Sequence, residues 1–212
     1  MSEARVTAIE TEAVRGFLHE PNKATGAGLV LTHGAGSDCA APLLVAVATA
    51  FCERGFTVLR CDLAFRRKRP KGPPAPATAA ADRAGLRDAV ATLREHVSGA
   101  IYLGGHSYGG RQASMLAAEA PDVATALLLL SYPLHPPLKP AQLRTQHFPQ
   151  LHVPALFVSG TKDGFGTIAE LETAIKAIPA ATRLIAIDGA GHDLKRGRFD
   201  LAALPDALTD LA

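Results

Sequence analysis

Short apolar runs, rich in branched side chains, alternate along the chain with longer stretches in which alanine and leucine recur at helical spacing. The runs are largely continuous in their apolar character, which is typical of strands buried on both faces of a sheet. The predicted strands cover residues 28–34, 56–62, 100–106, 125–133, 155–161 and 182–190. Strands and helices that alternate in this way build a mostly parallel central sheet with helices on both faces, so the predicted fold class is α/β.

Five stretches between and after these strands have the spacing of helices. Gly55, Pro121 and Pro179 lie where three of them should end, and Pro205 either breaks or begins the last one. For the first 20 residues we expect an antiparallel pair of strands at an edge of the sheet. The predicted helices cover residues 42–55, 78–97, 109–120, 167–178 and 201–212.

The length and composition favour one domain over residues 1–212. The chain has 48% hydrophobic and 20% charged residues, enough for one sizeable core and too little for two. Its formal charge of +2 gives no general affinity for nucleic acid or for an anionic membrane. The uncharged segment 123–134 is too short to span a bilayer, so we expect no membrane passage.

The cysteines and the first residues favour a cytoplasmic protein. Cys39, Cys52 and Cys61 are odd in number and fit neither a disulfide framework nor a CxxC metal pattern, so reduced thiols are the simpler interpretation. The chain begins "MSEARVTAIE", with charges where a signal peptide needs an apolar stretch.

The stretch "GGHSYGG", residues 104–110, places Ser107 where a predicted strand ends and a helix begins. Gly105 and Gly109 complete the G-x-S-x-G pattern of a nucleophile elbow, a turn so tight that a Cβ at either glycine would clash. An ordinary strand-to-helix turn is the alternative. A phosphate-binding loop is disfavoured, because Arg111 and Gln112 occupy the lysine and hydroxyl positions that such a loop requires.

A serine nucleophile needs a base, and the base needs an acid that fixes its tautomer. Asp163 follows one predicted strand and His192 the next, in the order Ser, Asp, His of the elbow hydrolases. Taken singly, the aspartate could belong to a turn and the histidine to the surface. Three other acids compete for this role. Asp62 also ends a strand, Asp188 is expected within a strand, and Asp193 is too near the histidine in sequence to approach its ring, so Asp163 is the preferred candidate.

The stretch "LTHGAGSD", residues 31–38, ends another predicted strand with small residues. The N–H of Ala35, together with that of Tyr108, could hold the oxyanion that forms during acyl transfer. An ordinary glycine turn is the alternative here. We interpret His33 as a packing or hydrogen-bonding residue and not as the base.

Six stretches together resemble the α/β-hydrolases. The resemblance is closest to a small lidless group that includes dienelactone-hydrolase-like proteins, testis-expressed hydrolase-like proteins and a subunit of the NSL chromatin complex. It implies the α/β-hydrolase fold without a lid domain, hydrolysis of an acyl bond, and a nucleophile, acid and base at Ser107, Asp163 and His192. The stretches are "LTHGAGSD", "GGHSYGGR", "SYPLHPP" with "LRTQH", "LFVSGTKDGFG" and "GAGHDL", between residues 31 and 194.

The chain departs from that group at "CDLAFRRKRPKG", where a hydrophobic-Pro-Tyr stretch is usual. Five of the six residues 66–71 are basic. Charge runs beside prolines are usually solvated, mobile loops, and we expect an exposed loop over residues 66–77. Because the run follows the carboxyl end of a strand, attraction of anionic acyl substrates is a second hypothesis.

The predicted function is that of a serine hydrolase acting on an ester, thioester or related acyl bond of a small to medium substrate. The connection 134–154 leaves little room for a lid, which favours an open site. We predict no cofactor, since the triad chemistry needs none, and no metal, since His135, His147 and His152 match no ligand spacing. A non-catalytic interaction module on the same fold and an acyltransferase stay open as alternatives.

Overall fold

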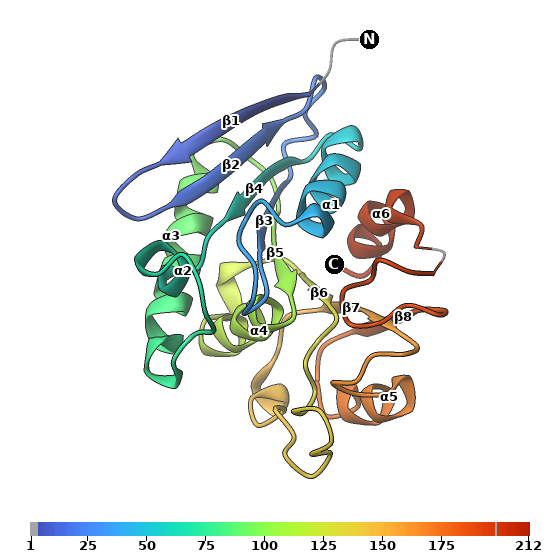
Figure 1. The fold of residues 1–212 in the computed structure, drawn as a ribbon. Coiled ribbons are helices and arrows are strands. Elements are labelled where there is room, and N and C mark those ends of the chain that lie inside the picture. Colours follow the sequence, from blue (N-terminus) through green and yellow to red (C-terminus); the bar gives the residue numbers. More distant parts are fainter. Residues whose placement is uncertain (1–3, 198) are drawn as a thin grey trace.

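A computed structural model of the chain describes residues 4–197 and 199–212. Its centre is an eight-stranded sheet in the order β1-β2-β4-β3-β5-β6-β7-β8 (Figure 1). The first two strands, β1 (Arg5–Glu10) and β2 (Arg15–Glu20), pair antiparallel at one edge, as predicted for the start of the chain. The other strands are β3 (Gly28–Thr32), β4 (Thr57–Cys61), β5 (Ile101–His106), β6 (Leu127–Leu130), β7 (Ala155–Gly160) and β8 (Thr182–Ile187).

From β4 to β8 every neighbouring pair of strands is parallel, so their carboxyl ends lie along one edge of the sheet. The register places Thr32 at the end of β3 opposite both Cys61 of β4 and Gly105 of β5. This is the edge at which open parallel sheets place their functional groups.

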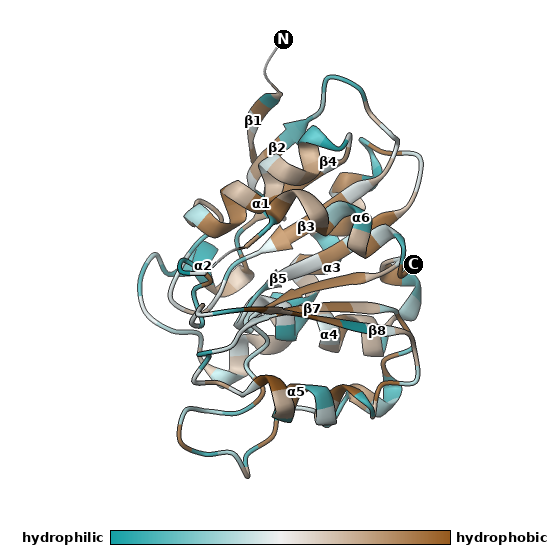
Figure 2. Ribbon diagram, turned by 90° about the vertical axis from the view of Figure 1, so that its right-hand side faces the viewer, coloured by the Kyte–Doolittle hydropathy of each residue, from teal (hydrophilic) through white to brown (hydrophobic). Residues whose placement is uncertain are grey.

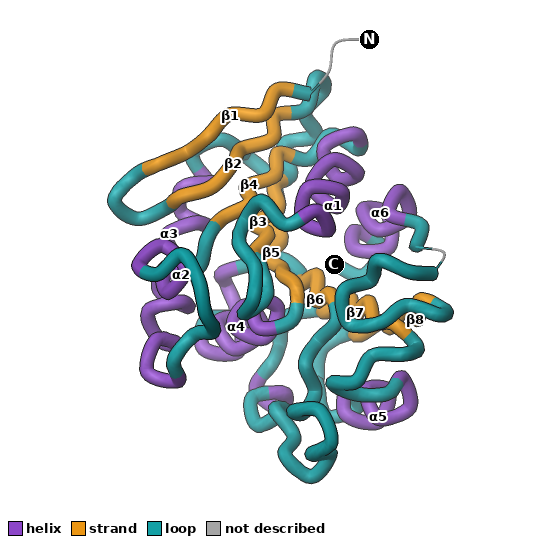
Figure 3. The backbone as a smooth tube through the Cα atoms, in the orientation of Figure 1, coloured by secondary structure: helices purple, strands orange, loops and turns teal. Residues whose placement is uncertain are grey.

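Helices cover both faces of the sheet, and each face has its own apolar core, which confirms the predicted α/β class. On one face α3, α4 and α5 bury apolar side chains, and on the other face α1 and α6 do so. Figure 2 shows apolar strands between the helices, and Figure 3 shows the same arrangement by element type. The helices are α1 (Pro42–Glu53), α2 (Ala64–Lys68), α3 (Ala79–Arg94), α4 (Tyr108–Glu119), α5 (Ile168–Ile175) and α6 (Leu204–Thr209).

Several predicted elements are shorter in the structure. The strand predicted over 125–133 is β6, which ends at Leu130 because Ser131 has a φ of +47°. The strand predicted over 182–190 ends at Ile187, before the turn at Gly189 with a φ of +72°. At the end of the chain, Pro205 lies at the beginning of α6.

The expectation of an exposed loop from residue 66 onward is wrong for its first part. Residues Ala64–Lys68 form the short helix α2, and Arg66 within it is only 3% exposed. The guanidinium is buried because backbone carbonyls surround it and accept its hydrogen bonds. The sequence gives no sign of these acceptors, since they are backbone carbonyls and two of them lie about thirty positions upstream.

The connection between β6 and β7 contains only a single 3₁₀ turn, Phe148–Gln150, and forms no lid domain in the described part of the chain. Figure 3 shows it as a long stretch of loop. Among the described helices, none combines the length and the apolar character needed to cross a bilayer.

Candidate active site

The turn between β5 and α4 holds Ser107 in a conformation that few residues adopt. Its φ is +51° and its ψ is −117°, which is strained for a side chain with a Cβ. The flanking glycines are required, because a Cβ on Gly105 would lie 2.8 Å from the Thr32 carbonyl oxygen, and one on Gly109 would lie 2.5 Å from that of His33. Ser107 is therefore held at the carboxyl edge of the sheet, as the elbow pattern predicts.

The loops after β7 and β8 bring Asp163 and His192 to this serine. His192 Nε2 lies 2.8 Å from Ser107 Oγ. On the other side of the ring, Nδ1 lies 2.8 Å from Asp163 Oδ2 and 2.9 Å from Oδ1. Three residues that are distant in sequence thus form one continuous hydrogen-bonded chain.

The protons in this chain can be assigned from the partners. A carboxylate only accepts hydrogen bonds, so His192 Nδ1 carries the hydrogen and donates it to Asp163. Nε2 then has a free lone pair directed at the Ser107 hydroxyl. This arrangement can remove the proton from the serine while the aspartate stabilises the charged ring.

The acid is held in place by its own turn. The Asp163 side chain is 1% exposed, and its Oδ1 also accepts the Phe165 N–H at 2.8 Å. The Phe165 ring stacks on His192, with centroids 4.1 Å apart and planes inclined by 28°. The stacked ring limits the rotation of the imidazole out of line with the serine. Sequence reasoning missed this residue, which lies two positions after the aspartate.

The competing acids have other partners. Asp188 accepts a hydrogen bond from Thr161 Oγ1 at 3.3 Å, and the exposed Asp193 lies 3.5 Å from Lys195 Nζ. Within the described part of the chain, neither carboxylate forms a hydrogen bond with the His192 ring. The structure thus places Asp163, and not these two, beside the imidazole.

The loop after β3 lies directly against the serine. A Cβ on Gly34 would be 3.4 Å from Ser107 Cβ and 3.0 Å from His106 Nδ1. Within the described residues, the N–H groups of Ala35 and Tyr108 donate no hydrogen bond to protein atoms. Tyr108 is the first residue of α4, where the N–H lacks a partner within the helix. Both predicted oxyanion donors therefore have a free N–H.

His33 has a defined structural task beside this loop. Its ring is fully buried, and its Nε2 accepts the Leu63 N–H at 3.1 Å. The hydrogen therefore lies on Nδ1, which donates to the Gly34 carbonyl at 2.8 Å. Burial lowers the pKa of His33, so the ring stays neutral. This agrees with its interpretation as a hydrogen-bonding residue.

His106, the second residue of the elbow pattern, is a further contact that the sequence did not indicate. Its Nε2 donates to the His192 carbonyl at 2.8 Å, and burial lowers the pKa of its ring. The bond ties the loop that carries the candidate base to the strand that carries the candidate nucleophile.

The remaining candidate residues lie outside this constellation. Burial raises the pKa of Cys39 and of Cys61 to about 12, so neither thiol is activated. His147 contacts Ser114 Oγ at 2.8 Å, and His135 Nδ1 contacts its neighbouring carbonyl. Within the part of the chain that the structure describes, no three His, Cys, Asp or Glu side chains gather in a way that could hold a metal ion.

The mostly parallel sheet, the helices on both faces and the strained serine between β5 and α4 define the class of α/β hydrolases. The chain belongs to the family described as alpha/beta hydrolase domain, whose model matches residues 25–210.

Solved structures show the same fold. A dienelactone hydrolase from Anabaena variabilis has 23% identity and a TM-score of 0.74, with 99% of this chain and 97% of that one covered. Est1E from Butyrivibrio proteoclasticus has 19% identity and a TM-score of 0.70, with the same coverage. A serine hydrolase without lid from Xanthomonas campestris has 17% identity and a TM-score of 0.67, with 99% and 94% covered.

Proposed function

We propose that the protein is a serine hydrolase that cleaves an ester, thioester or related acyl bond. The observation that carries this proposal is the distance of 2.8 Å between His192 Nε2 and Ser107 Oγ, with the opposite ring nitrogen held by Asp163. In this geometry the neutral imidazole accepts the hydroxyl proton as the oxygen attacks an acyl carbonyl.

The reaction proceeds in two steps. In the first, Ser107 Oγ attacks the carbonyl carbon, His192 takes the serine proton and then gives it to the leaving group, and the acyl group becomes bound to the serine. In the second, His192 takes a proton from water as the water oxygen attacks the acyl carbonyl carbon, and then gives that proton to Ser107 Oγ as the bond between the acyl carbon and Oγ breaks and the acid leaves. Asp163 keeps the imidazole in the required tautomer throughout.

Each step passes through a tetrahedral intermediate with a negative oxygen. The free N–H groups of Ala35, in the loop after β3, and of Tyr108, at the beginning of α4, are the donors that we assign to this oxygen. Removal of one such donor costs about 10²–10³ in kcat.

For the substrate we propose a small to medium acyl compound, because no lid domain covers the described part of the site. We propose the cytoplasm as its location, which the three free cysteines favour. The hypothesis of an anionic substrate needs a new basis, because Arg66 and Arg67 donate to backbone carbonyls. It now rests on the exposed Lys68, Arg69 and Lys71. If neutral esters and esters with a terminal carboxylate lose the same factor in kcat/KM on Lys68→Ala and Lys71→Ala, this hypothesis is wrong.

The proposed chemistry is tested by intact mass after incubation with a fluorophosphonate. We expect a single adduct on the unaltered protein, none on Ser107→Ala, and strongly slowed labelling of His192→Ala, because the serine is then without its base. Ser98→Ala, which alters an exposed serine, is the matched control and should label normally.

An unaltered, folded protein that forms no adduct would contradict the enzyme proposal and favour a non-catalytic interaction module. If the adduct forms, product analysis in the presence of alcohols or thiols separates hydrolysis from acyl transfer.

A further inference from the structure

Arg66 is a buried cation without an acidic partner. It is 3% exposed, and no carboxylate oxygen of the described residues lies within 4.0 Å of its guanidinium. A buried charge is costly unless hydrogen bonds compensate it. Here the compensation comes from backbone carbonyl oxygens of Ser37 at 2.8 Å, Pro70 at 2.8 Å, Ala35 at 2.9 Å, and Arg69 and Gly72 at 3.2 Å.

These carbonyls belong to two separate segments of the chain. Ala35 and Ser37 lie in the loop after β3, which we call the oxyanion loop (residues 33–38), and the other three acceptors lie just after α2. Arg66 Nη2 reaches the Ala35 carbonyl and Nε reaches that of Ser37, so one rigid guanidinium fixes both carbonyls. Lysine could not replace it, because its single ammonium lacks the planar fork of donors.

The orientation of the Ala35 N–H follows from these contacts. The Gly34 carbonyl is held by His33 Nδ1 at 2.8 Å on one side of the loop. A trans peptide is planar, so its N–H points opposite to its carbonyl, and fixing the Gly34 oxygen fixes the direction of the Ala35 N–H. Arg66 fixes the next peptide through the Ala35 oxygen. Both peptides that meet at Ala35 are therefore restrained.

The same short helix also reaches the second oxyanion donor. The Phe65 N–H donates to Asp82 Oδ1 at 2.8 Å, and Asp82 Oδ2 accepts the Tyr108 hydroxyl at 2.8 Å. The Phe65 ring makes edge contacts with His33 and with Tyr108, at centroid distances of 5.7 and 5.8 Å. Helix α2 thus links the oxyanion loop to the first residue of α4.

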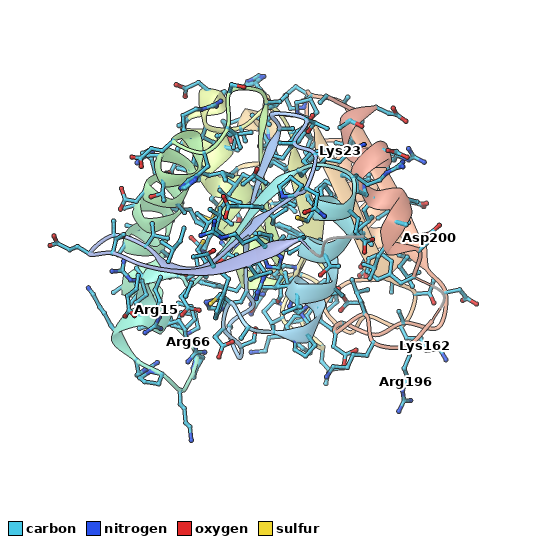
Figure 4. The ribbon with its side chains drawn as sticks, turned by 90° about the horizontal axis from the view of Figure 1, so that it is seen from above. Arg15, Lys23, Arg66, Lys162, Arg196 and Asp200 are labelled. Atoms are coloured by element: carbon cyan, nitrogen blue, oxygen red, sulfur yellow. The ribbon has the colours of Figure 1, made fainter. Side chains whose placement is uncertain are left out.

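The position of α2 is itself secured from the edge of the sheet. Figure 4 shows Arg15 and Arg66 close together, and Arg15 Nη2 donates to the Arg66 carbonyl at 3.2 Å. Arg15 also forms an ion pair of 2.8 Å with Asp62, whose Oδ1 accepts the Cys39 N–H just beyond the oxyanion loop. The guanidinium of Arg66 is therefore held against the loop by a hydrogen-bonded frame.

We propose that Arg66 is a positioning residue that holds the oxyanion loop in the geometry needed for the transition state. This inference rests on the proposed function and deepens it, since it assigns a role at the same site to a residue that touches no substrate. A displacement of about 1 Å in a catalytic group costs about 100-fold in rate, so we expect a contribution of about 10- to 100-fold from Arg66.

The test compares Arg66→Ala and Arg66→Lys with Arg67→Ala. Arg67 lies on the same helix and also donates to backbone carbonyls, but those of Glu12 and Ala13 at the turn between β1 and β2. We expect kcat for an ester to fall about 10- to 100-fold in both Arg66 variants with KM changed less than about threefold, because the lost interaction acts in the transition state. Arg67→Ala should have the same kcat as the unaltered protein.

Three further measurements distinguish positioning from general destabilisation. The inhibition constant of a trifluoromethyl ketone, which forms a tetrahedral adduct on Ser107, should rise by the same factor as kcat/KM falls. The pH dependence of kcat/KM should stay unchanged. Free guanidinium should restore part of the kcat of Arg66→Ala and none of that of Arg67→Ala.

An Arg66→Lys protein that folds and has the same kcat as the unaltered protein would overturn the inference. So would a change in KM without a change in kcat, or an inhibition constant that does not rise as kcat/KM falls. If Arg66→Ala fails to fold, the lysine variant decides by the same criteria. A failure of the proposed function looks different, because the unaltered protein would then neither form the fluorophosphonate adduct nor hydrolyse esters.

Discussion

Replacement of Asp163 by asparagine should disable the site, because it moves the hydrogen of the neutral His192 ring from Nδ1 to Nε2. The Asp163 Oδ1 accepts the Phe165 N–H at 2.8 Å, so the oxygen of an asparagine side chain stays there and its NH₂ takes the place of Oδ2. That NH₂ then faces His192 Nδ1, which is 2.8 Å from Oδ2 in the unaltered protein. The amide oxygen at the position of Oδ1, 2.9 Å from Nδ1, already accepts the Phe165 N–H, while the NH₂ needs an acceptor of its own. We therefore expect the tautomer in which Nδ1 accepts a hydrogen bond from the NH₂.

The hydrogen of the neutral imidazole then moves to Nε2, 2.8 Å from Ser107 Oγ. In this tautomer the ring donates to the serine and cannot accept its proton. We expect kcat to fall about 10⁴-fold, which corresponds to about 5 kcal/mol of transition-state stabilisation. The size and shape of the side chain are preserved, so the fold and KM should change little.

The assay is hydrolysis of an activated ester, together with the rate of fluorophosphonate labelling, measured on Asp163→Asn and on the control Asp188→Asn. Asp188 also follows a strand near the site, but it contacts Thr161 and not the imidazole. Its amide variant should lose less than about threefold in kcat. The reasoning is refuted if Asp163→Asn keeps more than about a tenth of kcat, or if Asp188→Asn loses as much.

Two further predictions concern stability. Tyr108→Phe should lower the free energy of unfolding in urea by about 1.5–3 kcal/mol, because it deletes the hydroxyl that donates to the fully buried Asp82. The control Tyr102→Phe should change this free energy by less than about 0.5 kcal/mol, and equal effects of the two variants would contradict this account. Burial, and secondarily the charge of Arg60, lower the pKa of His19 from 6.5 to about 4. Between these pH values the unfolded chain binds more protons than the folded protein, so the free energy of unfolding should fall as the pH falls from 6.5 to 4. His19→Gln should make the urea midpoint less dependent on pH between 6.5 and 4, and an unchanged dependence would count against the buried neutral ring.

The parallel strands and the three residues at their ends could be predicted from the sequence. The strands are continuous apolar runs, and the carboxyl ends of parallel strands meet at one edge, so Ser107, Asp163 and His192 could be expected to lie near one another. Strand ends were less predictable, because a positive φ such as that of Ser131 interrupts a run that remains apolar.

The support behind the oxyanion loop could not be predicted. Arg66 lies in a run of basic residues and prolines, a composition that is typical of a solvent-exposed loop. Its acceptors are backbone carbonyls, which carry no sequence signal. The hydrogen bond between Asp82 and Tyr108 joins residues 26 positions apart on different helices, a pairing that neither residue indicates alone.

The connection between β6 and β7 has a consequence for laboratory evolution. It meets the site where the His135 N–H donates to the Phe165 carbonyl at 3.0 Å, beside the ring that stacks on His192. Farther along, Leu138 is 98% exposed, so chain added there displaces no core. Doubling the length of a flexible loop costs only about 0.6 kcal/mol. Insertions at this point should therefore be tolerated while the strand ends that carry Ser107, Asp163 and His192 stay as they are.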